Sequence, residues 1–473
     1  MSRPALEFGR RQMPRFVAEL REFVGFPTVS SAPEQQPAIA ACAEWLGGKL
    51  REAGMPRVEI LENGRHPVVY GEAIAVPELP TLLVYGHFDV QPPGPAEEWL
   101  TPPFQATIRG RDLYGRGASD DKGPLFVHVK AIECFLASGL GLPVNVRVLF
   151  ESGEEVGSPG LRRLLESNRG AMAADAVVVS DTRMLGPRIP AVTYSLRGSL
   201  ACELRVSRSS GELHSGAFGG MVRNPLEVLA GILARLHDSQ GRVAVPGFYD
   251  SVRRVSSAER RFMAAEGPSN GKLLVAAGVD SGWGEPGFTA YERVSVRPAL
   301  TVNGISGGHQ SAGGKAVIPA SGAAKFSFRL VPDQSPAGVE RLLRQHLQRQ
   351  GQPGMEVRLA VTSSARPAVL DRRHPVSLAA SAAYRAGFGV DAVFVRSGGT
   401  IPVVNDLMEV LGAPVALMGF ALPDDRMHAA NERFHLPAFA GGLATSIDFM
   451  ERLRTLSPQT SRGIDRFSST ELS

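Results

Sequence analysis

The stretch Thr81-Leu82-Leu83-Val84-Tyr85-Gly86-His87-Phe88-Asp89 joins a short apolar run to a histidine and an acid. The run is too short for a helix and ends at Gly86, which predicts a buried strand. Open α/β sheets place their sites at the carboxyl ends of such strands, so His87 becomes a candidate metal ligand. Asp89 would lie on the same side of an extended chain and could accept the second imidazole N–H.

Further apolar runs and helical periodicity surround this strand. Strand-like runs occupy residues 144–150, 176–179 and 415–419, and helical patterns occupy residues 11–24, 37–53, 123–138 and 159–167. Their alternation predicts an α/β domain.

The segment between the last of these strand-like runs and the others has a different sequence pattern. Alternating strands at 201–206 and 324–330, with helices near 224–237 and 336–349, predict an inserted α+β domain. We therefore expect a catalytic domain in two parts, 1–197 and 367–473, around an insert at 198–366. The serine-rich segment 457–473 is predicted to be a mobile tail.

Length and composition limit the class of protein. The chain has 473 residues, 43% of them hydrophobic and 21% charged, which predicts a globular protein of two domains. A formal net charge of only +4, without a long basic run, argues against nucleic-acid binding. No stretch approaches the roughly 20 apolar residues of a membrane span. Three widely spaced cysteines, and an N-terminus without an apolar signal region, predict a cytoplasmic protein with free thiols.

Acidic residues stand near the ends of the predicted elements as well. Asp120 lies in the glycine-rich segment 115–123 just before a predicted helix, where it could be a metal ligand or only a helix N-cap. Glu154 and Glu155 follow the strand at 144–150. Adjacent carboxylates suit one metal ligand beside one general base, although a solvated acidic turn has the same pattern.

Two further ligand candidates complete the set. Asp181 follows the run at 176–179, and His428 follows the run at 415–419. Together the candidates supply two imidazoles and three carboxylates, a mixture that suits paired Zn²⁺ with one bridging carboxylate. Because carboxylate-rich sites accept several metals, Mn²⁺ or Co²⁺ could take the place of Zn²⁺.

These motifs resemble those of the co-catalytic zinc metallopeptidases of the aminoacylase, succinyl-diaminopimelate desuccinylase and carboxypeptidase G type. Within that family the chain looks most like the cytosolic non-specific dipeptidases and carnosinases. The resemblance runs from Phe26-Pro27-Thr28-Val29-Ser30 through Leu113-Tyr114-Gly115-Arg116-Gly117-Ala118 to His428. It implies a three-layer α/β catalytic domain with a mixed central sheet, an inserted α+β lid or dimerisation domain, and a homodimer.

The resemblance also implies roles for the candidate residues. Asp120 would bridge two metals, with His87 and Asp181 on one of them and Glu155 and His428 on the other. Glu154 would be the general base that deprotonates a metal-bridging water, and the resulting hydroxide would attack the substrate carbonyl. A cis peptide bond is implied between Asp120 and Asp121.

Three residues resemble substrate contacts of the family. His214 looks like the histidine that reaches the active site of the partner subunit and steadies the oxyanion, although an exposed turn would also carry such a residue. Arg329 matches the arginine that pairs with the C-terminal carboxylate of the substrate, since a planar guanidinium binds a carboxylate bidentately; a solvated strand arginine is the alternative. His374 matches a substrate-contacting position, although histidine before proline is also common in loops.

The segment Arg396-Ser397-Gly398-Gly399-Thr400-Ile401-Pro402 resembles the family loop Arg-Glu-Gly-Gly-Ser-Ile-Pro, whose glycines and hydroxyl bind the substrate carboxylate. Gly399 and Thr400 are the corresponding candidates. Ser397 stands in place of the acid, and Thr182 and Arg183 stand where dipeptidases usually carry asparagine and an aromatic residue. These departures bear on substrate selectivity.

The expected activity is metal-dependent hydrolysis of a peptide bond next to a free C-terminal carboxylate, in dipeptides or short peptides. Hydrolysis of N-acyl or N-carbamoyl amino acids is the alternative, since it uses the same metals and the same grip on the carboxylate. A non-catalytic binding module would usually lack a ligand or the base. All five ligand candidates and Glu154 are present.

Overall fold

The computed structural model describes residues 2–74, 76–350 and 353–456, so the predicted tail at 457–473 lies outside the described residues. The chain divides into two compact units. The first unit runs from the N-terminus to Tyr194 and continues in Leu370–Val395 and from Pro402 onward. The second unit comprises Ser195–Val369 and Arg396–Ile401.

A mixed sheet has the strand order β1-β2-β6-β3-β7-β17-β8-β15, with β16 paired with β8, and all of its strands except β15 lie wholly or mostly in the first unit. Strand β3 is parallel to β6 and β7, β17 is parallel to β7, and β2 and β8 are antiparallel to their neighbours β6 and β17. The bounds are β1 Arg57–Leu61, β2 Val68–Ala73, β3 Thr81–His87, β6 Asn145–Glu151, β7 Ala176–Val179, β8 Ala191–Leu196, β15 Ala368–Val369, β16 Val393–Arg396 and β17 Val415–Met418.

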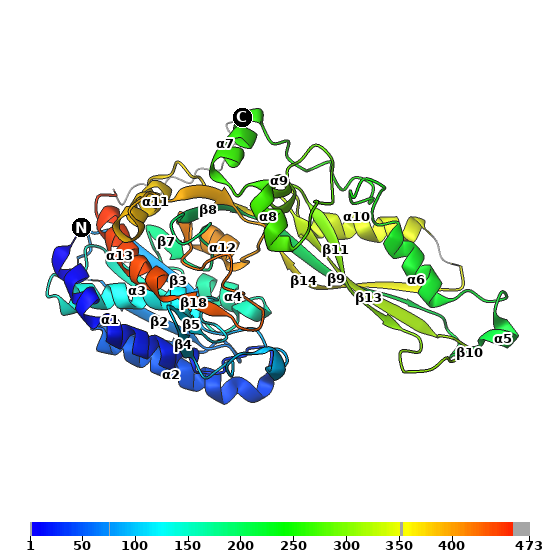
Figure 1. Ribbon diagram of the computed structural model, residues 1–473, viewed down its shortest axis with the longest axis horizontal. Coiled ribbons are helices and arrows are strands. Elements are labelled where there is room, and N and C mark those ends of the chain that lie inside the picture. Colours follow the sequence, from blue (N-terminus) through cyan, green and yellow to red (C-terminus); the bar gives the residue numbers. More distant parts are fainter. Residues whose placement is uncertain (1, 75, 351–352, 457–473) are drawn as a thin grey trace. The chain divides into compact units, whose positions relative to one another are not determined.

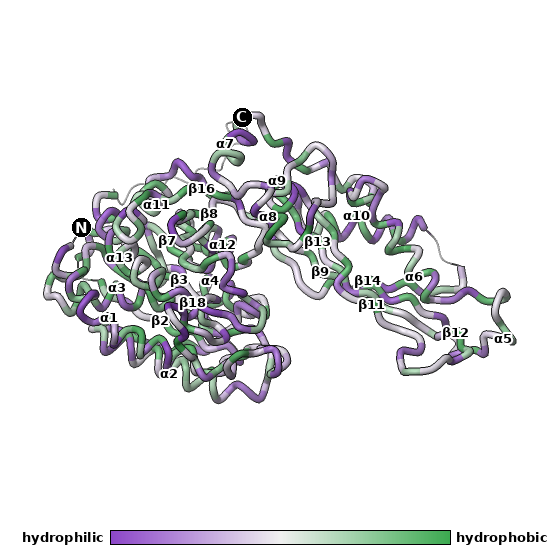
Figure 2. The backbone as a smooth tube through the Cα atoms, in the orientation of Figure 1, coloured by the Kyte–Doolittle hydropathy of each residue, from purple (hydrophilic) through white to green (hydrophobic). Residues whose placement is uncertain are grey.

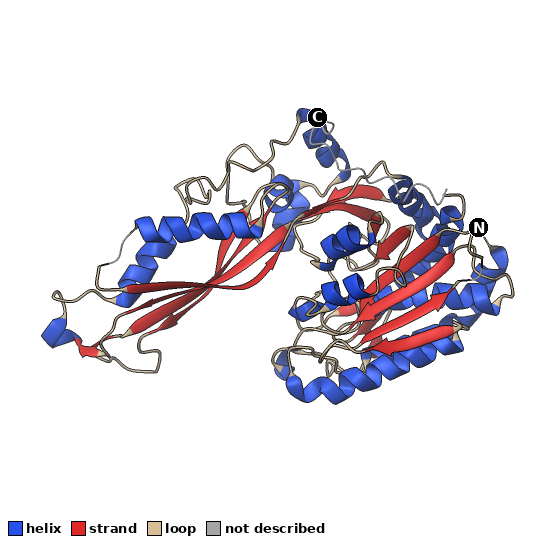
Figure 3. Cartoon of the chain, turned by 180° about the vertical axis from the view of Figure 1, so that it is seen from behind, coloured by secondary structure: helices blue, strands red, loops and turns tan. Residues whose placement is uncertain are grey.

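Helices cover both faces of this sheet. The longer helices are α1 Arg3–Val24, α2 Gln36–Glu52, α3 Lys122–Ala137, α11 Pro375–Phe388 and α13 Leu436–Leu453. Helices α1, α3 and α13 stand in front of the strands in Figure 1, and the short helices α4 Leu161–Ser167 and α12 Val403–Asp406 stand in front of them in the opposite view of Figure 3. The predicted three-layer α/β fold is therefore confirmed.

The core explains why these segments fold as they do. Leu82 and Val84 of β3 share one hydrophobic core with Phe126 of α3 and Leu46 of α2. Hydrophobic and hydrophilic residues alternate along α1 in Figure 2, as expected of a helix that buries one face. Helix α1 begins earlier than the sequence pattern predicted, because the buried residues Ala5 and Leu6 extend its apolar face.

The second unit is built on an antiparallel sheet with the order β11-β13-β9-β14. Its strands are β9 Gly198–Ser207, β11 Ala299–Gly307, β13 Ser321–Leu330 and β14 Glu356–Ala365. Helices α6 Pro225–Ala234 and α10 Pro336–Arg349 pack against this sheet. The smaller elements are β10 Leu213–His214, β12 Val317–Ile318, α5 Ser215–Phe218, α7 Ser257–Glu266, α8 Asn270–Ala277 and α9 Ala290–Ser295.

Three further features concern a small sheet of the first unit, the three cysteines and the described helices. A small sheet joins β4 Thr107–Arg109, β5 Asp112–Tyr114 and β18 Arg433–His435. The three cysteines are buried free thiols, as predicted. Among the described helices, none is both long enough and apolar enough to cross a membrane.

Candidate metal centre

The candidate ligands gather where parallel strands of the first unit end. His87 is the last residue of β3, Asp181 follows β7, and His428 follows β17. Glu155 lies in a single turn of 3-10 helix, Glu154–Val156, directly after β6. These strands run in one direction, so their carboxyl ends meet at one edge of the sheet.

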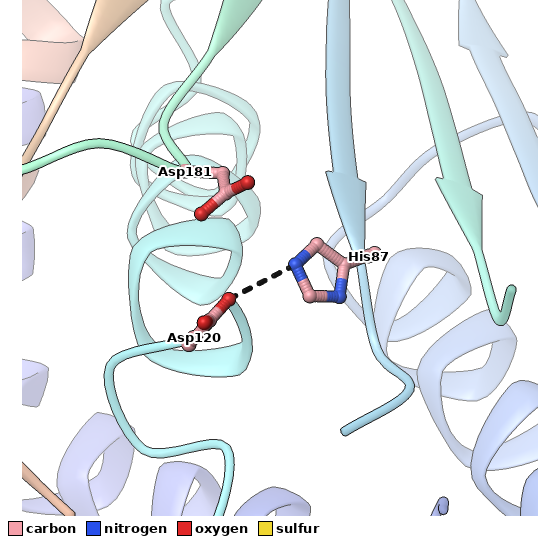
Figure 4. A group of neighbouring side chains, drawn as sticks. All are labelled: His87, Asp120 and Asp181. Atoms are coloured by element: carbon pink, nitrogen blue, oxygen red, sulfur yellow. Dashed lines mark ion pairs between the residues drawn. The ribbon is translucent and has the colours of Figure 1, made fainter. Parts of the chain in front are cut away.

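Asp120 occupies the middle of the group. Its Oδ1 lies 3.2 Å from Nε2 of His87, and its Oδ2 lies 2.8 Å from Nε2 of His428. Donor atoms of His87, Asp120 and Asp181 lie within 4.8 Å of one another, as do those of Asp120, Glu155 and His428. Figure 4 shows the first of these groups, with His87 and Asp181 both facing the Asp120 carboxylate. One carboxylate thus presents an oxygen to each of two ligand clusters.

The donor set fits two divalent cations. Nε2 of His87 and Oε1 of Glu155 are buried and have no hydrogen-bond partner within the described residues, although such atoms normally find one. Burial raises the pKa of Asp181 well above its usual value, and the charge of Asp120 raises it further. Burial also opposes charge on His87, yet its pKa is raised because Asp120 and Asp89 lie against the ring. Bound cations would stabilise the buried negative charge of Asp181, and they would interact with the His87 ring in place of a proton.

Asp89 links the His87 strand to the acidic turn. Its carboxylate accepts the backbone N–H of Glu154 at 3.2 Å and of Glu155 at 3.1 Å. Nδ1 of His87 lies 3.1 Å from the main-chain oxygen of Asp89 and 3.4 Å from its Oδ1. The nearest acceptor of the His87 Nδ1–H is thus the main-chain oxygen of Asp89, with the carboxylate slightly farther away.

Glu432 organises the segment that precedes Asp120. Its buried carboxylate accepts N–H groups from Gly117 at 3.0 Å, Ser119 at 2.9 Å and Asp120 at 3.1 Å, and pairs with Nη1 of Arg116 at 2.7 Å. No role for Glu432 was expected from the sequence. Its position four residues after His428 was the only signal.

The acidic turn has one more polar neighbour that the sequence did not single out. Nε2 of Gln91 donates to Oε2 of Glu155 at 2.8 Å, which leaves the other oxygen of Glu155 facing His428. The peptide bond between Asp120 and Asp121 is cis, as the resemblance implied.

The predicted substrate contacts divide between the units. Nη1 of Arg329 donates to Oγ1 of Thr400 at 2.8 Å, and the backbone oxygen of the neighbouring Gly399 accepts from the Arg197 N–H at 3.0 Å, all within the second unit. His214 also belongs to the second unit, where it is exposed and its Nδ1 accepts the Gly216 N–H at 3.0 Å.

His374 belongs to the first unit. Its Nδ1 accepts the N–H of Val376 at 3.1 Å and so caps helix α11. Burial lowers the pKa of this imidazole. The neutral ring keeps Nε2 for another partner.

A family model described as Peptidase family M20/M25/M40 matches residues 83–452, which include every candidate ligand. The chain belongs to peptidase family M20/M25/M40. Among M20 relatives, the Cys-Gly metallodipeptidase dug1 of Schizosaccharomyces pombe is 33% identical over 95% of this chain and 97% of its own length.

Solved M20 structures share the whole fold. The crystal structure of human carnosine dipeptidase 1 has a TM-score of 0.85 and 28% identity, and covers 96% of this chain and 98% of that chain. The M20 metallo-carboxypeptidase Sso-CP2 of Sulfolobus solfataricus has a TM-score of 0.84 and 31% identity, with coverages of 93% and 99%. The family resemblance stated from the motifs is confirmed.

Proposed function

We propose that this M20 protein is a metal-dependent dipeptidase that cleaves the peptide bond next to a free C-terminal carboxylate in dipeptides or short peptides. The observation that carries the proposal is Asp120, which presents one oxygen to His87 and the other to His428. The similar proteins named as metallodipeptidases and as a carnosine dipeptidase support this substrate class. Nothing in the site favours the alternative, an N-acyl or N-carbamoyl amino acid hydrolase.

We propose two Zn²⁺ as the working metals, with Mn²⁺ or Co²⁺ as possible substitutes. The ligands would be Asp120 between the two ions, with His87 and Asp181 on one and Glu155 and His428 on the other. Divalent cations held there would supply Lewis-acid activation of the substrate carbonyl and of the attacking water.

The protein's own side chains would complete the reaction. The Glu154 carboxylate has no hydrogen bond to another described residue, and its backbone is held by Asp89 beside the ligand Glu155. It could therefore take a proton from the attacking water and return it to the leaving amine. His214 would donate a hydrogen bond to the oxyanion. His374 would supply a further substrate contact through Nε2.

The proposed carboxylate grip lies in the second unit. Arg329 and Thr400 are already joined by a hydrogen bond, and Gly399 offers backbone without a side chain to obstruct the substrate. A guanidinium beside a hydroxyl can bind a carboxylate, because both groups donate hydrogen bonds to its oxygens.

We propose that the second unit is also the lid and the dimerisation domain of a homodimer. Strand β11 is an edge strand of its sheet, and Val302 and Ile305 on it are 36% and 61% exposed. Both lie opposite buried residues of β13, Phe326 and Ala324, and so extend an apolar face beyond the helices. Exposed apolar edge strands are natural pairing surfaces. Light scattering should show a dimer that Ile305→Lys weakens; a monomeric wild type would refute the proposal.

The activity is tested with paired substrates. The metal-loaded protein should hydrolyse Ala-Ala and leave N-acetyl-alanine intact, and activity on the second compound alone would refute the dipeptidase proposal. Glu154→Gln should lower kcat by about 10²- to 10⁴-fold while metal content, measured by mass spectrometry, stays at the wild-type level. Location in the cytoplasm stays a prediction, to be checked by fractionation.

A further inference from the structure

Arg197 and Arg329 stand close together in the second unit. Arg329 lies opposite Ser199 in the β9–β13 ladder, and Arg197 precedes Ser199 by two residues. Residues two apart on extended chain face the same side, so the two arginines are diagonal neighbours. Both side chains are half-buried.

Neither arginine has an acidic partner within the described part of the chain. Arg197 donates from Nε to the oxygen of Gly398 at 3.1 Å and from Nη1 to the oxygen of Arg297 at 3.4 Å. Arg329 donates to the Thr400 hydroxyl. Arg297 of the same unit, by contrast, pairs with Glu285 at 2.7 and 2.8 Å.

Electrostatics make this pair unfavourable on its own. Burial, followed by the positive charge of Arg329, lowers the pKa of Arg197 to about 10, and burial lowers the pKa of Arg329 as well. Two like charges held together away from water repel each other and lose hydration. A bound anion would offset both costs.

The surrounding loop is fitted to the Arg197 guanidinium. A side chain at Gly398 would place its Cβ 3.0 Å from Nη2 of Arg197 and 2.4 Å from the backbone oxygen of Val294, so only glycine fits there. The Thr400 hydroxyl donates to the backbone oxygen of Arg197 at 2.7 Å while it accepts from Arg329. Hydrogen bonds thus connect the loop, both arginines and the Thr400 hydroxyl into one network.

We infer that Arg197 is a second cation of the anion site formed by Arg329 and Thr400, and that it determines specificity for a carboxylate over a neutral carboxamide at the C-terminal end of the substrate. The inference rests on the proposed function, which assigns the substrate carboxylate to Arg329 and Thr400. It adds a residue whose charge, rather than its packing, sets the preference.

The test measures binding to the metal-loaded protein by calorimetry. The probes are two Ala-Ala analogues in which –CH₂–NH– replaces the peptide bond, one with a free C-terminal carboxylate and one with a carboxamide. The wild type should prefer the acid. Arg197→Gln should reduce the acid-to-amide affinity ratio by about 10-fold or more, as expected from loss of a charge-assisted contact. Arg197→Lys, which keeps the charge, should retain most of the ratio.

Arg205→Gln is the matched control, because it removes an exposed arginine from the same strand, β9. It should leave the ratio unchanged. If Arg197→Gln does not fold, Arg197→Lys decides the question, with Arg329→Gln as the reference for a lost carboxylate contact. An acid-to-amide affinity ratio in Arg197→Lys that equals that of the wild type supports the inference. A ratio as low as that of Arg329→Gln overturns it. A folded Arg197→Gln with the wild-type ratio also overturns it.

Hydrolysis of Ala-Ala by the wild type separates the two claims. If Ala-Ala is not cleaved but Arg197→Gln still loses the preference for the acid, the proposed function fails and the anion site stands. If Ala-Ala is cleaved and Arg197→Gln keeps the preference, only the role of Arg197 fails.

Discussion

Glu432 holds the backbone of the loop that carries Asp120. Three backbone N–H groups and the Arg116 guanidinium converge on its two oxygens, and the residue is fully buried. Groups that orient a metal ligand without touching the metal commonly affect metal affinity. The loop conformation, and with it the direction of the Asp120 carboxylate, therefore depends on the charge and the acceptor capacity of Glu432.

We expect Glu432→Gln to weaken metal binding by about 10- to 100-fold, because an amide has one acceptor oxygen where the carboxylate has two. Competition with a chromophoric chelator measures the affinity for Zn²⁺. Glu292→Gln is the control, since Glu292 is a buried acid that pairs with Arg260 in the second unit. Equal zinc affinity in Glu432→Gln and the wild type would contradict the role assigned to Glu432.

The sequence indicates residues at this scale only where they stand next to a recognisable element. His87 and Asp181 could be predicted because each ends or follows an apolar run. The contact of Glu432 with the Asp120 loop could not, because the two lie 312 residues apart. The orientation of the Asp89 carboxylate could not be predicted either, because it depends on the position of the backbone N–H groups of Glu154 and Glu155 in the folded chain.

At the scale of elements, short apolar runs located the central strands to within a few residues. The runs at 176–179 and 415–419 correspond to β7 and β17, which are parallel neighbours. The position of β17 between β7 and β8 could not be predicted from the sequence, because that order depends on long-range pairing. The site could still be anticipated, since the carboxyl ends of parallel strands share one edge whatever their order.

Helix α3 links the core to the strand end that carries Asp181. His128 of α3 is buried, with Nε2 2.7 Å from Oγ of Ser180 and Nδ1 2.9 Å from Oγ of Ser446. Burial lowers its pKa to about 3. An unfolded chain takes up this proton near pH 6.5. The unfolded state therefore binds more protons between these values, and the folded state loses stability as the pH falls through that range.

We expect His128→Gln to remove this pH dependence. Between pH 7 and 5 the wild type should lose about 2 kcal/mol more of its free energy of unfolding than the variant, with a slope that approaches about 1.4 kcal/mol per pH unit below pH 6.5. Melting temperatures of the metal-free proteins at a series of pH values provide the measurement. His309→Gln, which replaces an exposed histidine, should follow the wild type. Parallel curves for His128→Gln and the wild type would refute the assignment.

At the scale of the whole molecule, the candidate site residues are divided between two compact units. All five candidate ligands and Glu154 belong to the first unit, whereas Arg197, Arg329 and Thr400 belong to the second. The sequence pattern indicated an inserted domain at 198–366. The second unit also includes the short segment Arg396–Ile401, which lies outside that range. This assignment follows from bonds that a linear pattern does not show, such as those of Arg197 with Gly398 and Gly399.

This division predicts that metal removal acts on one unit only. The acids around Asp120 repel one another once the cations are gone, so chelation should destabilise the first unit and spare the second. Metal at about 1,000 times its Kd would stabilise the folded state by about 4 kcal/mol. Hydrogen exchange with and without chelator should show faster exchange at 83–90, 115–125 and 176–182. Exchange in β9 and β13 should stay unchanged, and added Zn²⁺ should restore protection; equal loss in both units would show that the metals stabilise the whole chain.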